Sequence, residues 1–233
     1  FAASVVGAAL GQGGPAGVAS PGVSPEACEA AHRVGAEVLL DAYHHLNIVP
    51  WEPVDPRAFV AGGGYKYAQW GEGCCFLRVP AGCALRPVHT GWFADFAGLG
   101  GDQTGPIAYG PTGGDRFAGS TYDPTSHYRA RAVIEFFAAH DLSVERLRAL
   151  SLHQTGTLME LLADQTILTP ADPARRGGFV TVQRLAAGEL VGRLRERGVW
   201  VDARRDRLRF GPAPYVTDDE LERAVSIFHE VTR

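Results

Sequence analysis

The short apolar run Glu37-Val-Leu-Leu-Asp41 constrains the fold of this chain more than any other stretch. Such a run is typical of a strand buried in a parallel sheet. A helix is predicted just before it, with Ser24 as its N-cap and Gly35 at its end. The earlier run Ala2–Val6 also predicts a buried strand, and strand, helix, strand is the crossover unit of an α/β sheet. Ligands of such sheets lie beyond the carboxyl ends of the strands, where Asp41 is expected.

Apolar patterning and turn residues divide the rest of the chain into predicted elements. The residue patterns of 54–60 and 75–79 are typical of strands. The pattern changes at 179–184, and further strands are predicted after it, near residues 199 and 208. Helices are predicted at 126–139, 143–163 and 185–197 and from residue 217, where Thr217-Asp-Asp-Glu220 has the form of a capping box. Stretches rich in Gly and Pro predict loops at 12–22, 98–125 and 170–178. We therefore predict part of a large α/β domain over 1–140 and a small α+β domain over 141–233.

Lys66 is the only lysine in a chain whose other long cationic side chains are all arginines. It therefore marks a position where a guanidinium would not serve, because Arg stays charged whereas the amine of Lys can attack a carbonyl. The preceding glycines, Gly62–Gly64, allow the backbone to pass close to a bulky group, and Tyr65 and Tyr67 place a phenol on either side. The alternative is a surface lysine retained by chance.

Composition excludes several classes of function. The 233 residues are 45% hydrophobic and 21% charged, as in an ordinary globular protein. The net charge of −4 and the scattered arginines argue against a nucleic-acid surface. No apolar run reaches the length of a membrane span and no signal peptide is recognisable, so neither a membrane nor secretion is expected. The four cysteines suit neither a disulfide framework nor a metal site and are predicted to be reduced thiols of a cytoplasmic protein: Cys28, Cys74, Cys75 and Cys83.

The spacing of Asp41-Ala-Tyr-His44 and Tyr65-Lys66 resembles that of pyridoxal-phosphate enzymes of fold type I. Within them it is closest to the class V aminotransferase group, and there to kynureninase. The resemblance covers nearly the whole chain and implies the C-terminal part of such an enzyme, with a mainly parallel large-domain sheet and a small α+β domain. The family's phosphate-binding loop and stacking aromatic ring are not found here. Because the chain starts with the apolar run at Phe1 and its only methionine is Met159, we expect a preceding segment.

The resemblance implies a role for each residue of this pattern. Lys66 would form the Schiff base with pyridoxal phosphate and then remove the Cα proton of the substrate. Asp41 would pair with the pyridine nitrogen and keep it protonated, which makes the ring an electron sink. His44 would lie against the ring and phosphate, and Tyr65 would contact the phosphate and share in proton transfer. The structural alternatives are a helix or turn cap for Asp41, a surface histidine at His44 or His45, and packing for Tyr65.

Two later segments resemble parts of the family that reach a neighbouring subunit. Val88-His-Thr-Gly91-Trp92-Phe93 resembles the Gly-Trp-Trp/Phe segment of kynureninases, which implies that Trp92 reaches the partner's cofactor region. The family usually continues with Gly-His, whereas Ala94-Asp95 stand here, which bears on whether the same aryl-ketone substrate is bound. In the segment 117–124, Thr121 would contact the partner's phosphate. The resemblance thus implies a homodimer with shared active sites, and the alternative is a lid that acts within one subunit.

A third segment resembles the substrate-binding end of the family. Leu208-Arg209-Phe-Gly-Pro-Ala-Pro-Tyr215 is similar to the kynureninase segment Ile-Arg-Val-Ala-Pro-Val-Pro-Leu-Tyr. Arg209 would then grip the α-carboxylate of an amino-acid substrate with a bidentate fork. The alternative is one more surface arginine beside Arg204, Arg205 and Arg207.

Three functions remain open from the sequence. The first is a kynureninase-like hydrolysis of the Cβ–Cγ bond of a γ-keto amino acid, through Lys66. The second is another class V reaction, either transamination or a Cβ elimination. A desulfurase is disfavoured, because its catalytic cysteine should lie far from the lysine and no cysteine follows Cys83. The third is a non-catalytic remnant of the fold that serves as a partner module.

Overall fold

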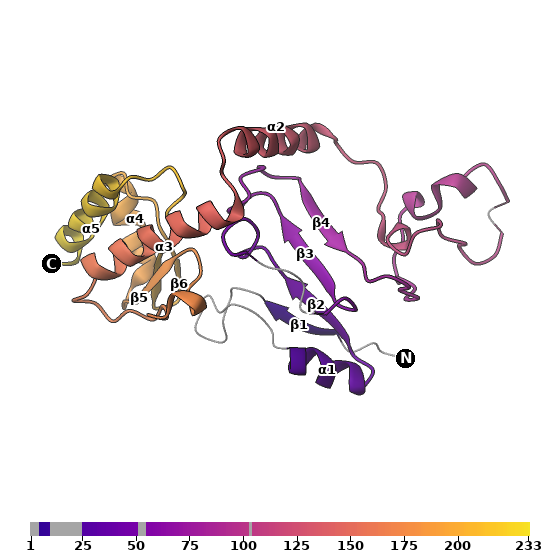
Figure 1. Ribbon diagram of the computed structural model, residues 1–233, viewed down its shortest axis with the longest axis horizontal. Helices are drawn as coiled ribbons and strands as arrows, with labels where there is room; N and C mark the ends of the chain where they lie inside the picture. Colours follow the sequence, from indigo (N-terminus) through magenta and orange to yellow (C-terminus); the bar gives the residue numbers. More distant parts are fainter. Residues whose placement is uncertain (1–4, 10–24, 51–54, 103) are drawn as a thin grey trace.

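The computed structural model describes residues 5–9, 25–50, 55–102 and 104–233, and side chains are described from residue 25 onward. The predicted loop at 12–22, the Ser24 cap and the start of the stretch at 54–60 lie outside these residues. Two sheets organise the described chain, one of four strands in the first third and one of three strands near the C-terminus (Figure 1).

The four-stranded sheet contains the predicted crossover unit. Its order is β1 (Val5–Ala9), β2 (Glu37–Asp41), β3 (Phe59–Gly63) and β4 (Cys75–Arg78), and α1 (Pro25–Arg33) connects β1 to β2. The first three strands are parallel and β4 is antiparallel to β3. Of the first strand, predicted at 2–6, residues 2–4 lie outside the described residues; the described strand continues past residue 6 to Ala9, where it pairs with Asp41 at the end of β2.

The core of this part forms where α1 packs on the sheet. On β2 the side chains of Val38 and Leu40 are buried, while Glu37, Leu39 and Asp41 are half-buried. Asp41 pairs with Ala61 in the register of β2 and β3, so the carboxyl ends of these strands lie side by side. The loop that contains Lys66 therefore begins at the strand ends where ligands of α/β sheets are ordinarily held.

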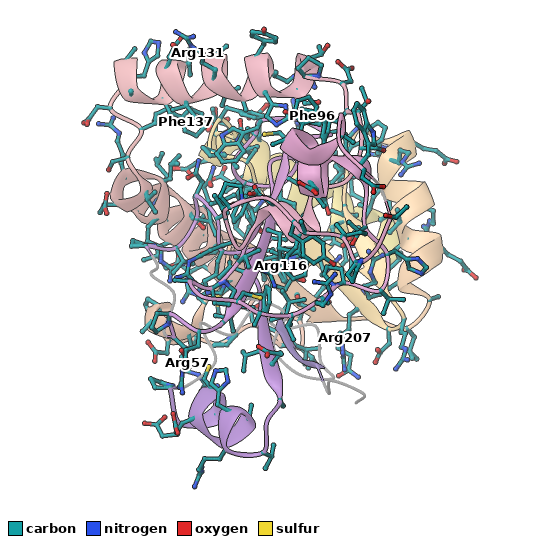
Figure 2. The ribbon with its side chains drawn as sticks, turned by 90° about the vertical axis from the view of Figure 1, so that its right-hand side faces the viewer. Arg57, Phe96, Arg116, Arg131, Phe137 and Arg207 are labelled. Carbon is teal, nitrogen blue, oxygen red and sulfur yellow. The ribbon has the colours of Figure 1, made fainter. Side chains whose placement is uncertain are left out.

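A loop-rich segment follows the sheet, as the Gly and Pro content predicted. It contains two short 3₁₀ helices, η1 (Trp92–Gly98) and η2 (Asp115–Phe117), and leads into α2 (Thr125–Ala139). Figure 1 shows this segment at the end of the four-stranded sheet that is opposite to the C-terminal lobe. Figure 2 views the molecule from that end and labels Phe96 and Arg116 within the segment.

The C-terminal lobe is a three-stranded antiparallel sheet with helices packed against it. Its sheet has the order β5-β7-β6. Its elements are α3 (Val144–Leu161), η3 (Pro173–Arg175), β5 (Val180–Gln183), α4 (Ala187–Glu196), β6 (Asp202–Arg204), β7 (Arg207–Phe210) and α5 (Asp218–Thr232). The capping box predicted at Thr217 and Glu220 is present at the start of α5. The domain boundary between residues 140 and 141 stays a prediction.

One predicted strand of this lobe is wrong in position. The strand expected near Val199 begins only at Asp202. Val199 instead closes the end of α4: its N–H donates to the carbonyl oxygen of Leu194 at 2.9 Å, and Gly198 before it has a φ of +82°. This is the geometry of a helix C-cap, in which a glycine in the left-handed region lets the next apolar residue fold back onto the core.

The core of the C-terminal lobe lies between its sheet and α3, α4 and α5. It includes Leu158 from α3, Leu194 from α4 and Leu208 from β7, all nearly inaccessible to solvent. Phe228 of α5 is fully buried, and its ring lies 5.6 Å from the ring of Phe210 at an angle of 89°. Among the described residues no helix combines the length and apolar character needed to cross a membrane.

We predict that Phe228→Ala lowers the free energy of unfolding by about 3–5 kcal/mol, because it removes a fully buried ring and leaves a cavity. Urea unfolding measures the change. Leu185→Ala is the matched control in the same lobe: Leu185 is 87% exposed, so its truncation should change stability by no more than about 0.5 kcal/mol. Equal losses in the two variants would contradict this assignment of the core.

Candidate active site

The three glycines before Tyr65 lie against aromatic side chains of the chain itself. A Cβ on Gly62 would lie 2.5 Å from the Cζ of Phe76, and a Cβ on Gly64 would lie 2.6 Å from the Cβ of Trp70. A Cβ on Gly63 would overlap the ring of Tyr43. The close approach expected from the sequence is therefore real. At Gly63 it lets the segment that follows Asp41 settle beside the Lys66 loop.

Asp41 closes the turn that follows β2. Its Oδ1 accepts a hydrogen bond of 3.0 Å from the backbone N–H of Tyr43, and the N–H of Ala42 donates to the carbonyl oxygen of Ala61 at 2.8 Å. The structural alternative left open by the sequence, a turn cap, thus describes one carboxylate oxygen of Asp41. The same carboxylate acts on His44 through space and favours its protonated form.

His44 lies where the two lobes meet. Its ring is 6.4 Å from that of Tyr67 and 6.0 Å from that of Phe179, edge-on in both cases. The pKa of His44 is lowered to about 4, first by burial and then by the positive charges of Lys66 and Arg209. Its imidazole is therefore neutral at pH 7.

Lys66 stands on the loop that leaves β3. The loop is closed by a hydrogen bond of 2.8 Å from the N–H of Trp70 to the carbonyl oxygen of Gly64. The Nζ of Lys66 lies 5.2 Å from the ring centre of Tyr65, and the Tyr65 ring lies 5.5 Å from that of Tyr43. The half-buried Lys66 thus lies beside the phenol ring of Tyr65, which in turn lies beside that of Tyr43.

Lys66 lines two cavities between the lobes, and both also include His44, Tyr67 and Gly211. The Arg209 cavity, of about 310 Å³, is completed by Phe179, Trp200, Val201, Asp202 and Arg209. The Tyr65 cavity, of about 490 Å³, is completed by Tyr65, Gln69, Gly71, Pro212, Ala213 and Tyr215. A larger cavity of about 650 Å³ inside the C-terminal lobe is lined by neither lysine nor histidine, so the chemistry favours the two cavities at Lys66.

Arg209 is held in place and is not a surface arginine. Its side chain is 13% exposed, compared with 72% for Arg204. The Nε of Arg209 donates to the Oδ1 of Asp202 at 2.6 Å, and its Nη2 donates to the Oδ2 of the same residue. Its guanidinium carbon lies 5.4 Å from the ring centre of Phe179. Asp202 was not identified from the sequence. The one signal that could have found it is the predicted hairpin, in which an acidic residue pairs across the strands with Arg209.

The structure does not bring Trp92 or Thr121 to Lys66 within one chain, and neither lines the two cavities. Trp92 packs in an aromatic cluster, with ring centres 4.6 Å from Phe93 and 5.9 Å from Phe96. Thr121 is exposed. His45, the other candidate beside His44, is buried and lines neither cavity. In the described part of the chain no group of His, Cys, Asp and Glu side chains is placed to hold a metal ion.

Comparison with known proteins shows which sequences this chain resembles. The family described as Kynureninase C-terminal domain matches residues 147–228. The kynureninase of Pseudomonas fluorescens is 30% identical over 214 residues, which cover 86% of this chain and 50% of that protein. The kynureninase of Koribacter versatilis is 32% identical over 212 residues, covering 81% and 47%. The chain spans about half the length of these curated relatives.

Solved structures show the same fold at low sequence identity. A complex of the cystine C-S lyase C-DES with cysteine persulfide matches with a TM-score of 0.75 at 16% identity, covering 97% of this chain and 60% of that chain. A mutant of C-DES, solved with glycine covalently linked to its PLP cofactor, matches with a TM-score of 0.74. A cysteine desulfurase from Thermococcus onnurineus matches with a TM-score of 0.69 at 15% identity and covers 98% and 60%.

The chain thus has the fold of the pyridoxal-phosphate enzymes of fold type I and corresponds to their C-terminal part. Its likeness in sequence is to the kynureninases, and residues 147–228 match the family model described as Kynureninase C-terminal domain. The resemblance seen in the sequence is confirmed at this level.

We predict that Gly178→Ala lowers the free energy of unfolding by about 1–3 kcal/mol, because the lobes meet too closely there for an added methyl group. A Cβ on Gly178 would lie 2.6 Å from the Cζ of Tyr67. In a Tyr67→Ala background the obstacle is gone, so the same substitution should cost almost nothing. Urea unfolding of the four proteins of this double-mutant cycle measures the difference. An equal cost in both backgrounds would show that Tyr67 is not the obstacle.

Proposed function

We propose that this chain supplies the lysine-bearing side of a pyridoxal-phosphate active site that acts on an amino acid. The observation that carries the proposal is the position of Lys66. The only lysine of the chain lines the junction of the two lobes together with neutral His44 from one lobe and Arg209 from the other. The likeness to kynureninases supports the same reading.

The residues at and beside the junction fit the ring end of pyridoxal phosphate. The amine of Lys66 and the neutral imidazole of His44 line both cavities, whereas the carboxylate of Asp41 lies at the end of β2 and lines neither. An amine, an imidazole and a carboxylate are the groups that the aldehyde, the ring and the ring nitrogen of the cofactor require. The phosphate end is not provided in the same way. Among the described residues that line the two cavities, none comes from the first turn of a helix, where a phosphate is ordinarily held.

Each residue has a defined task in this proposal. Bound pyridoxal phosphate supplies an electron sink for negative charge at the substrate Cα. Lys66 would hold the cofactor through its amine, and the released amine would take the Cα proton. Asp41 would accept a hydrogen bond from the ring nitrogen with the oxygen that does not cap the turn. Tyr65, which lies beside Lys66, would contact the phosphate and share in proton transfer. Arg209 would bind the substrate α-carboxylate.

The reaction that we propose is hydrolysis of the Cβ–Cγ bond of a γ-keto amino acid, as the likeness to kynureninases implies. Product analysis with kynurenine tests this choice: release of alanine and an aryl acid supports it. A new keto acid would point to transamination, and loss of the β-substituent alone would point to a Cβ-lyase. Ala94-Asp95, which stand where the family has Gly-His, lie in η1 and line neither Lys66 cavity of their own chain, so they would bear on the substrate through the site of a partner chain.

We predict that pyridoxal phosphate binds covalently at Lys66. The protein incubated with the cofactor should absorb visible light, and borohydride reduction should add the cofactor mass to the peptide that contains Lys66. Lys66→Arg keeps the positive charge but has no free amine, so it should take no label. Mass spectrometry locates the label. A colourless protein, or a label on another peptide, would show that the chain is a remnant of the fold without this site.

We also propose that the active unit is a homodimer with shared sites. The loop-rich segment between β4 and α2, which contains Trp92 and Thr121, lies at the end of the four-stranded sheet that faces away from the C-terminal lobe (Figure 1). Trp92 is 46% exposed and Phe96 is 61% exposed, so an aromatic surface is available there for a second copy. A two-fold interface would bring this segment of each chain to the Lys66 cavities of the other.

We predict that two inactive variants, Lys66→Ala and Trp92→Ala, restore kynurenine cleavage when their subunits exchange. In each mixed dimer one site carries both changes and the other carries neither. Random exchange of equal amounts should restore about a quarter of the wild-type rate, since half of the dimers are mixed and each has one intact site. Exchange is verified with tagged subunits. No recovery after verified exchange would show that Trp92 acts within its own chain.

A further inference from the structure

We propose that Asp202 is a positioning residue, which fixes the guanidinium of Arg209 so that one of its edges is presented to a carboxylate ligand. The inference rests on the proposed function, since the carboxylate is that of the amino-acid substrate. It assigns a role to an acidic residue that neither the sequence patterns nor the reaction has used.

The sheet itself sets the pairing of these two residues. Asp202 and Arg209 are direct cross-strand partners in the antiparallel pair of β6 and β7, so their side chains rise from the same face. The next pairs in this register are Ala203 with Leu208 and Arg204 with Arg207. Because two strands fix both backbones, the contact does not depend on a flexible loop.

Asp202 uses only one edge of the guanidinium. Its two oxygens accept from Nε and Nη2, which together form the side edge of the fork. Nη1, at the end edge, makes no hydrogen bond to any residue in the described part of the chain. The Phe179 ring lies 5.4 Å from the guanidinium carbon and packs against the group. An end edge with further N–H donors thus remains for a second carboxylate, which Arg can bind through two parallel bonds.

The exposures place Asp202 on the outer side of this pair. The side chain of Asp202 is 48% exposed and that of Arg209 is 13% exposed, although both line the cavity that contains Lys66. Burial works to raise the pKa of Asp202, but the hydrogen bond and the charge of Arg209 outweigh it and lower the pKa. Asp202 is therefore ionised at neutral pH and holds Arg209 from the solvent side.

A competing role for Asp202 predicts the opposite effect of its removal on amino-acid binding. If its carboxylate occupied the place of the substrate carboxylate, its removal would strengthen amino-acid binding. If it positions Arg209, its removal frees the guanidinium to rotate and weakens that binding. Because Asp202 contacts only the side edge of the Arg209 guanidinium, we favour the role in which Asp202 positions Arg209.

The experiment uses the full chain with pyridoxal phosphate bound and follows the visible spectrum of the cofactor during titration with L-alanine or L-alaninamide. The amide has no carboxylate, so it separates the action of Arg209 from general damage. Asp202→Asn should weaken L-alanine binding on the order of tenfold or more, as expected for loss of a charged hydrogen-bonded partner. The same variant should change L-alaninamide binding by less than about twofold, and Asp202→Glu should restore part of the loss.

Asp206→Asn is the matched control. It removes the same charge from the same hairpin, but Asp206 accepts a hydrogen bond from Gln183 and lines neither Lys66 cavity. It should leave binding of both ligands unchanged. Tighter L-alanine binding in Asp202→Asn would establish competition and overturn the proposal. Equally weaker binding of both ligands would show that Asp202 has only a structural role and would also overturn the proposal.

A second arm needs no cofactor and separates this inference from the proposed function. The ¹⁵N side-chain signals of Arg209, assigned by their loss in Arg209→Lys, are followed during titration of the cofactor-free protein with L-alanine. They should shift in the wild type and shift much less in Asp202→Asn. A response in a protein that takes no cofactor would reject the proposed function and keep the role of Asp202. No response in the wild type would overturn the role of Asp202.

Discussion

The contact between the two lobes is the interaction on which the site depends. The ring of His44 meets the rings of Tyr67 and Phe179 edge-on, and Tyr67 lies close against the backbone at Gly178. Without this contact Lys66 and Arg209 would be cations on separate surfaces. With it they share one cavity, and their combined charge adds to burial in keeping His44 neutral. The electrostatic character of the site is thus a result of how the lobes meet, and not of any one loop.

The sequence predicted those parts of the fold that local patterning decides. The apolar run at 37–41, the helix before it and the capping box at Thr217 follow from neighbouring residues, and each is present. The strand expected near Val199 was wrong because an apolar residue that closes a helix looks the same, in sequence, as one that begins a strand. Helix ends and strand starts compete for the same residues when a glycine lies between them.

A candidate site residue could be predicted from the sequence where its residue type alone is unusual. It could not be predicted where its role depends on a contact with a residue from another segment. Lys66 was singled out because it is the only lysine in the sequence, and the structure places it at the lobe junction. The partners of Gly62–Gly64 and the pairing of Asp202 with Arg209 are contacts between distant segments, and no spacing rule reveals them. At Asp41 the structure shows the turn cap, which uses one carboxylate oxygen, and the role of Asp41 toward a cofactor stays a prediction.

The presence of a single lysine in this sequence has a consequence for chemical probing. Lys66 carries the only ε-amine of the 233 residues, and it is half-buried in a cavity that Tyr65 and Tyr67 also line. Among these 233 residues, reagents that acylate amines therefore find one lysine side chain to modify. Its rate of modification would report directly whether the cavity is open or filled, which in most proteins is hidden beneath the signal of many surface lysines.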